Sequence, residues 1–277
     1  MPPLRGSGGF LRLNVLVISL LLALVIAKAS DNAQCRLYRD TRGYVLSKLR
    51  SHDLVLLGTT HKKTPILRFI SDLLPQLHEA AVTHLGLEIA SDQQQRIDHY
   101  MATGFGFDDI QIPPPVDCLQ YRFLLRMAQK LDQSRRPTVI ALDLPLSRFG
   151  GKMSRDEWMA RQIADVFRKD PNARMLAVPG TFHVLKEMRW QDHVPNKKKS
   201  VYGYLTRLAP EIEAFSIGQL IDEDPAECDF TRQFGPMDGA VALDCDERFS
   251  GWKMGIQFDI AIKPTQACDL VDGLIVY

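Results

Sequence analysis

The stretch Leu54–His61, LVLLGTTH, decides the predicted fold. Its four consecutive apolar, branched residues are typical of a strand buried in a parallel sheet. Gly58 ends the strand, and a helical pattern begins after Thr64-Pro65, so His61 falls in a strand-to-helix loop. Because ligands of open α/β sheets bind at the carboxyl ends of the strands, this loop is a candidate site.

Three further apolar runs end in a similar way, two in a carboxylate and one in a second Gly-x-x-His loop. The polar residues concerned are Glu88, Asp143 and His183. Since the carboxyl ends of parallel strands meet at one edge of a sheet, we expect these residues and His61 to converge there. The sequence therefore predicts an α/β fold with a central, mainly parallel sheet flanked by helices.

Hydrophobic periodicity and turn residues predict the remaining elements. The predicted strands are 53–57, 82–88, 138–143, 174–178, 212–217, 238–243, 255–262 and 272–276. The predicted helices are 44–49, 65–79, 91–101, 119–131, 158–168 and 201–208. Ser91 is a predicted N-cap, and Ser154 with Glu157 forms a predicted capping box. We interpret residues 91–135 as a small helical insertion over the strand ends, with ordinary crossover helices as the alternative.

The first 29 residues have the pattern of a secretory signal peptide. Arg5 and Arg12 precede an apolar run, 13–27, and Ala27-Lys28-Ala29 matches a small-x-small cleavage site. An uncleaved anchor is the alternative, although the run is near the short end for a spanning helix. We expect a periplasmic or extracellular protein with no stable membrane anchor after cleavage. Residues 30–277 would then form a single α/β domain, with its core in 53–277.

Charge and cysteine content narrow the function classes. Without residues 1–29 the formal net charge changes from +1 to −2, and no basic stripe interleaves with aromatic residues, so nucleic acid is not an expected partner. One or two disulfides are predicted in an oxidising compartment, one of them within the last 50 residues. The cysteines are Cys35, Cys118, Cys228, Cys245 and Cys268. The sequence leaves their connectivity open.

The predicted cluster contains side chains that suit acid–base or metal chemistry. His61 and His183 are candidate general bases or metal ligands, and two unrelated capping histidines are the alternative. Glu88 would orient an imidazole, act as a base or bind a metal; alternatively, it is solvated beyond the strand end. Asp143 is a candidate for the same roles as Glu88, although Asp143-Leu144-Pro145 is also compatible with an ordinary turn.

Arg155 stands out at the start of the helix that follows Asp143. The helix dipole disfavours a cation at this end, so we expect Arg155 to pair with Glu88 or Asp143 or to hold a substrate anion. A solvated first-turn residue is the alternative. Asp156 suits the helix start and carries no functional prediction.

Short motifs in a fixed order carry a family resemblance. They are Gly58-Thr59-Thr60-His61, Gly86-Leu87-Glu88 with Gln94 and Tyr100, Arg155-Asp156 with Met159-Ala160, Gly180-Thr181-Phe182-His183, and Val271-Asp272-Gly273-Leu274-Ile275. Over residues 53–277 this order resembles the superfamily that groups erythromycin esterases, the TraB and Tiki proteins and the ChaN-like haem-binding lipoproteins, and is most similar to the ChaN-like branch. The resemblance implies a pocket lined by the two Gly-x-x-His loops and the glutamate.

The resemblance and the residues together support two functional hypotheses and one inert alternative. The first is a secreted hydrolase in which His61, with Glu88, activates water, while His183 and Arg155 stabilise the oxyanion or position a small-molecule or peptide substrate. In a variant of it, His61, Glu88 and His183 hold a divalent transition metal. The second is a haem or metal carrier without turnover, with Tyr121 or Tyr100 as axial haem ligand.

In the third interpretation the constellation is purely structural and the protein is a non-catalytic remnant. Asp143 belongs to the candidate catalytic set under the first hypothesis. A homodimer is left open as a partner under all three.

Overall fold

The computed structural model describes residues 37–188, 192, 199–221, 240–244 and 266–277. Residues from Leu37 to Tyr277 group into one compact unit. The predicted signal peptide, the predicted strand 255–262 and three of the five cysteines lie outside the described residues.

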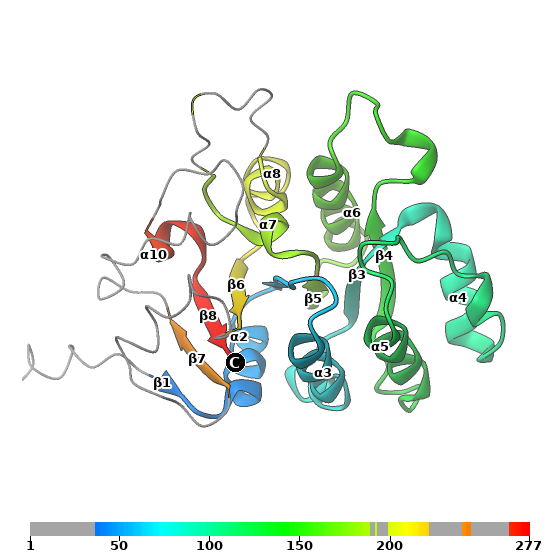
Figure 1. Ribbon diagram of the computed structural model, residues 1–277, viewed down its shortest axis with the longest axis horizontal. Coiled ribbons are helices and arrows are strands. Elements are labelled where there is room, and N and C mark those ends of the chain that lie inside the picture. Colours follow the sequence, from blue (N-terminus) through cyan, green and yellow to red (C-terminus); the bar gives the residue numbers. More distant parts are fainter. Residues whose placement is uncertain (1–36, 189–191, 193–198, 222–239, 245–265) are drawn as a thin grey trace, which may run out of the picture. The chain divides into compact units, whose positions relative to one another are not determined.

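Eight strands of the described residues form one sheet in the order β1-β7-β8-β6-β2-β5-β3-β4 (Figure 1). Their bounds are β1 Leu37–Tyr38, β2 Leu54–Leu57, β3 His84–Ala90, β4 Thr138–Asp143, β5 Met175–Val178, β6 Ala214–Leu220, β7 Val241–Asp244 and β8 Gly273–Val276. All pairings are parallel except those of β7 with β1 and β8. The predicted mainly parallel α/β sheet is confirmed, and the two-residue β1 is an addition that the sequence pattern did not indicate.

The helices lie on both faces of this sheet (Figure 1). Their bounds are α2 Thr41–Ser51, α3 Thr64–Leu73, α4 Gln94–Thr103, α5 Leu119–Lys130, α6 Arg155–Lys169, α7 Thr181–Val184, α8 Val201–Leu208 and α10 Ala267–Leu270. Short 3₁₀ helices are η1 Leu74–Ala80, η2 Ser91–Gln93, η3 Phe107–Asp109 and η4 Leu146–Arg148. Helices α2, α3 and α5 cover one face, and α6 and α8 cover the other.

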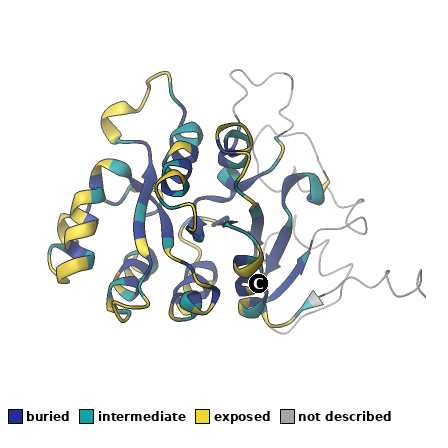
Figure 2. Ribbon diagram, turned by 180° about the vertical axis from the view of Figure 1, so that it is seen from behind, coloured by how far each residue is buried: buried dark blue, intermediate teal, exposed yellow. Residues whose placement is uncertain are grey.

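The position of strand β2 explains why its sequence does not alternate between polar and apolar residues. Val55 and Leu57 pack into the cluster with α2, α3 and α5, whereas Leu54 and Leu56 pack into the cluster with α6 and α8. Successive side chains point to opposite faces, and both faces are covered, so every residue of the strand is buried. Figure 2 shows this core as dark blue strands between helices whose outer faces are exposed.

Two helix boundaries differ from the prediction. The predicted helix 65–79 divides into α3 and the 3₁₀ helix η1, because Pro75 has no N–H to continue the α-helical ladder. Ser91 is not the predicted N-cap: it lies inside η2, and its Oγ accepts a hydrogen bond of 2.9 Å from Trp158 Nε1. The predicted Ser154 cap of α6 is confirmed, since Glu157 N donates to Ser154 Oγ at 3.1 Å, whereas the Glu157 carboxylate accepts from Arg161.

The connection between β3 and β4 contains two helices, α4 and α5, as expected. Helix α5 packs beside α3, and α4 packs against β4. Between α4 and α5 the chain returns toward the carboxyl edge of the sheet, where Gln111 N donates to Gln93 Oε1 at 3.0 Å. As a result, the first turn of α5, including Tyr121, lies close to the end of β3.

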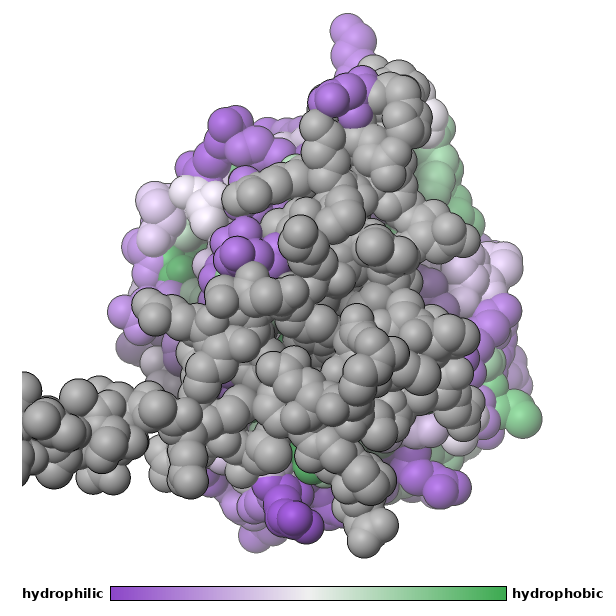
Figure 3. Space-filling model, turned by 60° about the vertical axis from the view of Figure 1, so that its left-hand side comes forward, coloured by the Kyte–Doolittle hydropathy of each residue, from purple (hydrophilic) through white to green (hydrophobic). Residues whose placement is uncertain are grey.

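The surface seen in Figure 3 is mainly hydrophilic wherever described residues are visible, with small, separate hydrophobic patches. Among the described residues, every helix is too short or too polar to cross a lipid bilayer. The apolar run 13–27 lies outside that part of the chain.

Gly58 allows the turn after β2 to pack closely against the turn after β5. A Cβ at this position would lie 2.7 Å from Val184 Cγ2 and 3.0 Å from Thr181 Cα. Its carbonyl oxygen accepts a hydrogen bond of 2.8 Å from Gln219 Nε2 on β6. The glycine therefore brings the His61 loop against the His183 loop, while β6 supports it from the other side.

We predict that Gly58→Ala lowers the free energy of unfolding by about 1–3 kcal/mol, because the added methyl overpacks this contact. Gly203→Ala is the matched control. Its Cβ would lie 3.4 Å from Lys199 Cβ, an ordinary contact, and the helix gains up to about 1 kcal/mol from losing a glycine. Urea unfolding of both variants measures the difference in the free energy of unfolding. A Gly58→Ala protein that unfolds at the same urea concentration as wild type would contradict the close contact at Gly58.

Candidate functional site

The two Gly-x-x-His loops are joined to each other through their backbones. Thr59 and Gly180 form a parallel bridge, in which Thr59 N donates to Pro179 O at 2.9 Å and Thr181 N donates to Thr59 O at 2.9 Å. This bridge exists because β2 and β5 are neighbours in the sheet and end at the same level. The predicted convergence of the two loops is confirmed.

Glu88 is the buried centre of the site, with 2% of its surface exposed. Its Oε2 accepts a hydrogen bond of 2.7 Å from Gly180 N, and its Oε1 accepts one of 2.5 Å from Arg155 Nη2. Burial alone would raise the pKa of this carboxyl, but the neighbouring His183, Arg155 and His61 lower the pKa to about 2. Glu88 is therefore ionised at neutral pH and is not the solvated residue of the alternative interpretation.

Arg155 pairs with both carboxylates that the sequence proposed for it. Its Nε donates to Asp143 Oδ1 at 2.8 Å and its Nη2 to Asp143 Oδ2 at 2.7 Å, in addition to the Glu88 bond. Burial opposes the charge on Arg155, but the two carboxylates outweigh burial and raise its pKa. The unfavourable position at a helix start is thus offset by two buried anions.

His183 is held between two carboxylates. Its Nδ1 lies 2.8 Å from Asp156 Oδ1, and its Nε2 lies 3.7 Å from Glu88 Oε1. Burial lowers the pKa of His183, but the hydrogen bond to Asp156 and the attraction of Glu88 outweigh it and raise the pKa to about 10. His183 is therefore an imidazolium at neutral pH.

His61 lies on the other side of the same carboxylate in a different environment. Its Nε2 is 3.9 Å from Glu88 Oε1, and its side chain keeps 34% of its surface exposed. A Cβ at Gly180 would lie 3.0 Å from His61 Nε2, so a side chain at this position would push the ring away from the backbone. Burial lowers the pKa of His61, and the attraction of Glu88 only partly compensates, so the imidazole is neutral at neutral pH.

Asp156 is a member of the candidate site that sequence reasoning missed. It was assigned only to the helix start, yet it carries the hydrogen bond that keeps His183 charged. Its signal in the sequence was its place in the Arg155-Asp156 motif. Since α6 begins at Arg155, both side chains lie in the first helical turn, at the carboxyl edge of β4.

The residues proposed as metal ligands do not fit a metal centre. Glu88 Oε1, one of the proposed ligand atoms, already receives a short hydrogen bond from the Arg155 guanidinium. Among the described residues, no group of three His, Cys, Asp or Glu side chains is arranged to hold a metal ion. The donor chemistry therefore favours acid–base use of these side chains.

The two tyrosines proposed as haem ligands lie in the hydrophobic core. Tyr121 is 3% exposed, and its buried hydroxyl has no hydrogen-bond partner among the described residues. Burial raises its pKa well above the usual value, which disfavours the phenolate that binds iron. Tyr100 is 5% exposed and packs edge-on against Phe107, with ring centroids 5.1 Å apart. Neither ring fits a haem pocket in this conformation.

Cys118 forms no disulfide in this structure. Cys35, Cys228 and Cys245 lie outside the described residues, so the predicted disulfides stay predictions.

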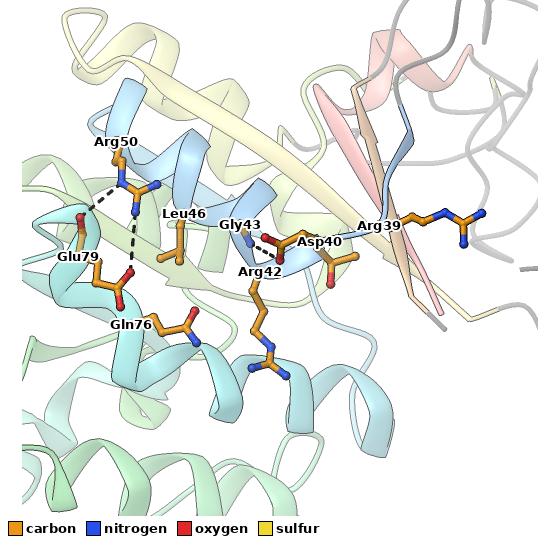
Figure 4. A pocket seen from close by; sticks show the side chains of 9 residues that line it. Arg39, Asp40, Arg42, Gly43, Leu46, Arg50, Gln76 and Glu79 are labelled. Atoms are coloured by element: carbon orange, nitrogen blue, oxygen red, sulfur yellow. Dashed lines mark hydrogen bonds and ion pairs between the residues drawn. The ribbon is translucent and has the colours of Figure 1, made fainter. Parts of the chain in front are cut away.

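A separate groove of about 620 Å³ lies along α2 and η1 and contains none of the predicted site residues (Figure 4). Its lining includes Arg39, Arg42 and Arg50. Arg50 Nε donates to Glu79 O at 3.4 Å, and Asp40 caps α2 by accepting from Gly43 N at 2.9 Å. The groove has no histidine or cysteine among its lining residues, so we assign the chemistry to the Glu88 cluster.

Solved structures of low sequence identity share the fold. A mutant erythromycin esterase in its open conformation aligns over 84% of this chain and 92% of its own, with 11% identity and a TM-score of 0.63. A succinoglycan biosynthesis protein aligns over 84% and 89%, with 12% identity and a TM-score of 0.57. A protein from Bacillus cereus aligns over 84% and 90%, with 11% identity and a TM-score of 0.54.

No protein-family model matches the sequence, and a comparison with curated proteins gives no significant match. The structural likeness confirms the predicted α/β fold, and the predicted superfamily stays a prediction. At these identities it shows the fold alone, and the ChaN-like branch stays a prediction.

The opposite pKa shifts in the site predict how stability depends on pH. The pKa of Glu88 falls from 4.5 to about 2, so its contribution is present above pH 4.5 and is lost as pH falls toward 2. The pKa of His183 rises from 6.5 to about 10, so its contribution is present below pH 6.5 and is lost as pH rises toward 10. We expect the largest free energy of unfolding between about pH 4.5 and 6.5.

Urea unfolding at a series of pH values measures this profile, in which each group changes stability by at most about 1.4 kcal/mol per pH unit. His183→Gln is the test variant, because it removes the titrating group. Its free energy of unfolding should fall less than that of wild type between pH 6.5 and 10. A His183→Gln profile with an unchanged alkaline limb would contradict the assignment of the proton to His183.

Proposed function

We propose that this protein is a hydrolase that cleaves an ester or amide bond by activating water at His61, without a bound metal. The fold is shared with an erythromycin esterase, which supports a hydrolase-like role at the coarse level. The side-chain cluster at the carboxyl edge of the sheet supports the finer assignment.

One observation carries this proposal: two histidines approach one carboxylate oxygen and have opposite pKa shifts. His61 has a lowered pKa and is neutral, whereas His183 has a pKa raised to about 10 and is charged. Titratable groups that their surroundings push in opposite directions are typical of acid–base pairs in enzymes. A purely structural cluster would not need a partly exposed, neutral imidazole beside a buried imidazolium.

His61 is the base in the proposed reaction. The 3.9 Å gap between its Nε2 and Glu88 Oε1 is too long for a direct hydrogen bond, and a water molecule bridges such separations. His61 Nε2 takes a proton from this water as the water oxygen bonds to the carbonyl carbon. The His61 imidazolium then returns the proton to the leaving oxygen or nitrogen as its bond to carbon breaks.

His183 and Arg155 supply positive charge for the oxyanion that forms on the carbonyl oxygen. Both stay protonated throughout, since the carboxylates Glu88, Asp143 and Asp156 raise the two pKa values by more than burial lowers them. Because they are held by hydrogen bonds before substrate arrives, little reorganisation accompanies the reaction. Glu88 is the fixed anion that positions both cations beside His61.

The amino-terminal segment 1–29 places this activity outside the cytoplasm in our proposal, as a signal peptide that is removed on export. Amino-terminal sequencing of protein recovered from the periplasm or medium tests this. A mature chain beginning at Ser30 supports export with cleavage, and a chain that retains Met1 in the membrane fraction contradicts it.

We predict that His61→Ala lowers kcat on an ester substrate by about 10²–10⁴-fold, the usual contribution of a general base, and that Glu88→Gln also loses most activity. A screen of p-nitrophenyl esters and chromogenic peptides identifies the substrate, and steady-state kinetics measure the loss. His99→Ala is the matched control, an exposed histidine on α4 outside the cluster, and should keep wild-type activity.

Two results would count against this proposal. Equal activity of His61→Ala and wild type would remove His61 as the base. A Soret band on addition of hemin, lost in Tyr121→Phe and accompanied by no hydrolysis of any ester or peptide, would support the haem-binding alternative instead.

The pH–rate profile gives an independent prediction. His61 acts only when neutral, and its pKa is lowered, so kcat/KM should rise with pH to a plateau with a midpoint below 6.5. Asp156→Asn removes the partner that keeps His183 charged, so activity should fall at a lower alkaline pH than in wild type. An unchanged alkaline limb in Asp156→Asn would contradict a positioning role for Asp156.

A further inference from the structure

The loop between β4 and α6 presents two hydrophobic side chains on a tight turn. Phe149 N donates to Leu146 O at 3.3 Å at the end of the 3₁₀ helix η4. Gly151 N then donates to Arg148 O at 3.1 Å. Phe149 has φ −61° and ψ 136°, and Gly150 has φ +83°, which are the central conformations of a type II turn.

This turn is attached to the elements that form the site. Arg148 stacks on the ring of Trp158 in α6, with its guanidinium carbon 4.9 Å from the ring centroid. Trp158 Nε1 donates in turn to Ser91 Oγ at the end of β3. The loop therefore has a defined conformation beside the carboxyl edge of β3 and β4.

Leu146 and Phe149 expose unusually large hydrophobic surfaces for a loop, 51% and 50% respectively. Phe149 directly follows η4, three residues after Leu146, so we expect the two side chains to lie on the same side of the loop. The ring centroid of Phe149 lies 5.9 Å from the guanidinium carbon of Arg155. A hydrophobic surface thus borders the cation of the proposed active site.

Arg155 has hydrogen-bond donors available to a ligand that binds beside Phe149. Its Nε and Nη2 bind Asp143 and Glu88, whereas its Nη1 has no hydrogen-bond partner among the described residues. The side chain also keeps 34% of its surface exposed. A carbonyl or carboxylate oxygen that accepts a bond from Nη1 would place the atoms attached to it near the ring of Phe149.

We infer that Leu146 and Phe149 form the wall that binds the apolar part of the substrate, and that the substrate is an ester or amide with an extended apolar group next to its carbonyl. This inference rests on the proposed function for the reaction, but the wall itself binds ligands whether or not they are cleaved. Phe149 is a specificity-determining residue in this assignment, and Gly150 holds it in place through the type II turn.

The test compares p-nitrophenyl hexanoate with p-nitrophenyl acetate. Wild type should prefer hexanoate, because the longer chain covers the wall. Phe149→Ala should lower kcat/KM for hexanoate about tenfold more than for acetate, mainly through KM. Phe149→Leu should restore most of the preference, since it keeps an apolar side chain.

Phe123→Ala is the matched control. Phe123 is 53% exposed on α5, and lies two residues after Tyr121, so it projects from the opposite side of that helix. This variant should keep both the activity and the chain-length preference of wild type. Equal losses on the two esters in Phe149→Ala, or the same change of preference in Phe123→Ala, would overturn the inference.

Direct binding separates this inference from the proposed reaction. Saturation-transfer NMR with hexanoate and acetate measures binding in the absence of turnover. Tighter binding of hexanoate to wild type than to Phe149→Ala supports the wall even if no ester is cleaved, in which case the proposed function fails alone. Equal binding to both proteins overturns the wall even if esters are cleaved.

Discussion

The ionised carboxylate of Glu88, buried at the end of β3, is the constraint on which the site depends. An isolated buried charge costs several kcal/mol, so Glu88 requires partners. Arg155 and the backbone N–H of Gly180 supply direct hydrogen bonds, and His183 supplies a second positive charge. Arg155 follows β4, whereas Gly180 and His183 both follow β5, so the carboxylate of β3 ties together loops that are far apart in the sequence.

The same carboxylate gives the two histidines different chemical characters. His183 is mostly buried and has a second anion, Asp156, at its other nitrogen, so its charge is stabilised. His61 is more exposed, and Glu88 at 3.9 Å is its one anionic neighbour among the described residues, so desolvation outweighs attraction and the ring is neutral. Asp156 thus accounts for the difference between the charged His183 and the neutral His61, which accepts a proton in the proposed reaction.

The sheet order explains how these residues meet. Strand β5 lies between β2 and β3, although it follows both in the chain. The second Gly-x-x-His loop therefore enters between the His61 loop and Glu88, and Gly180 contacts both. The β4–α6 connection closes the site on the far side, where it places Arg155 on the carboxylates and the Phe149 turn beside Arg155.

The sequence alone determined the buried strands, the two histidine loops and the acidic strand ends, because apolar runs followed by glycine or a carboxylate are local patterns. It also indicated that Arg155 needs an anion, since a cation at a helix start is locally unfavourable. Only the tertiary structure decided which anions it meets, that Asp156 supports His183, and that Tyr100 and Tyr121 are buried in the core. Those outcomes depend on strand order and on helix packing, and both arise from contacts between residues distant in the chain.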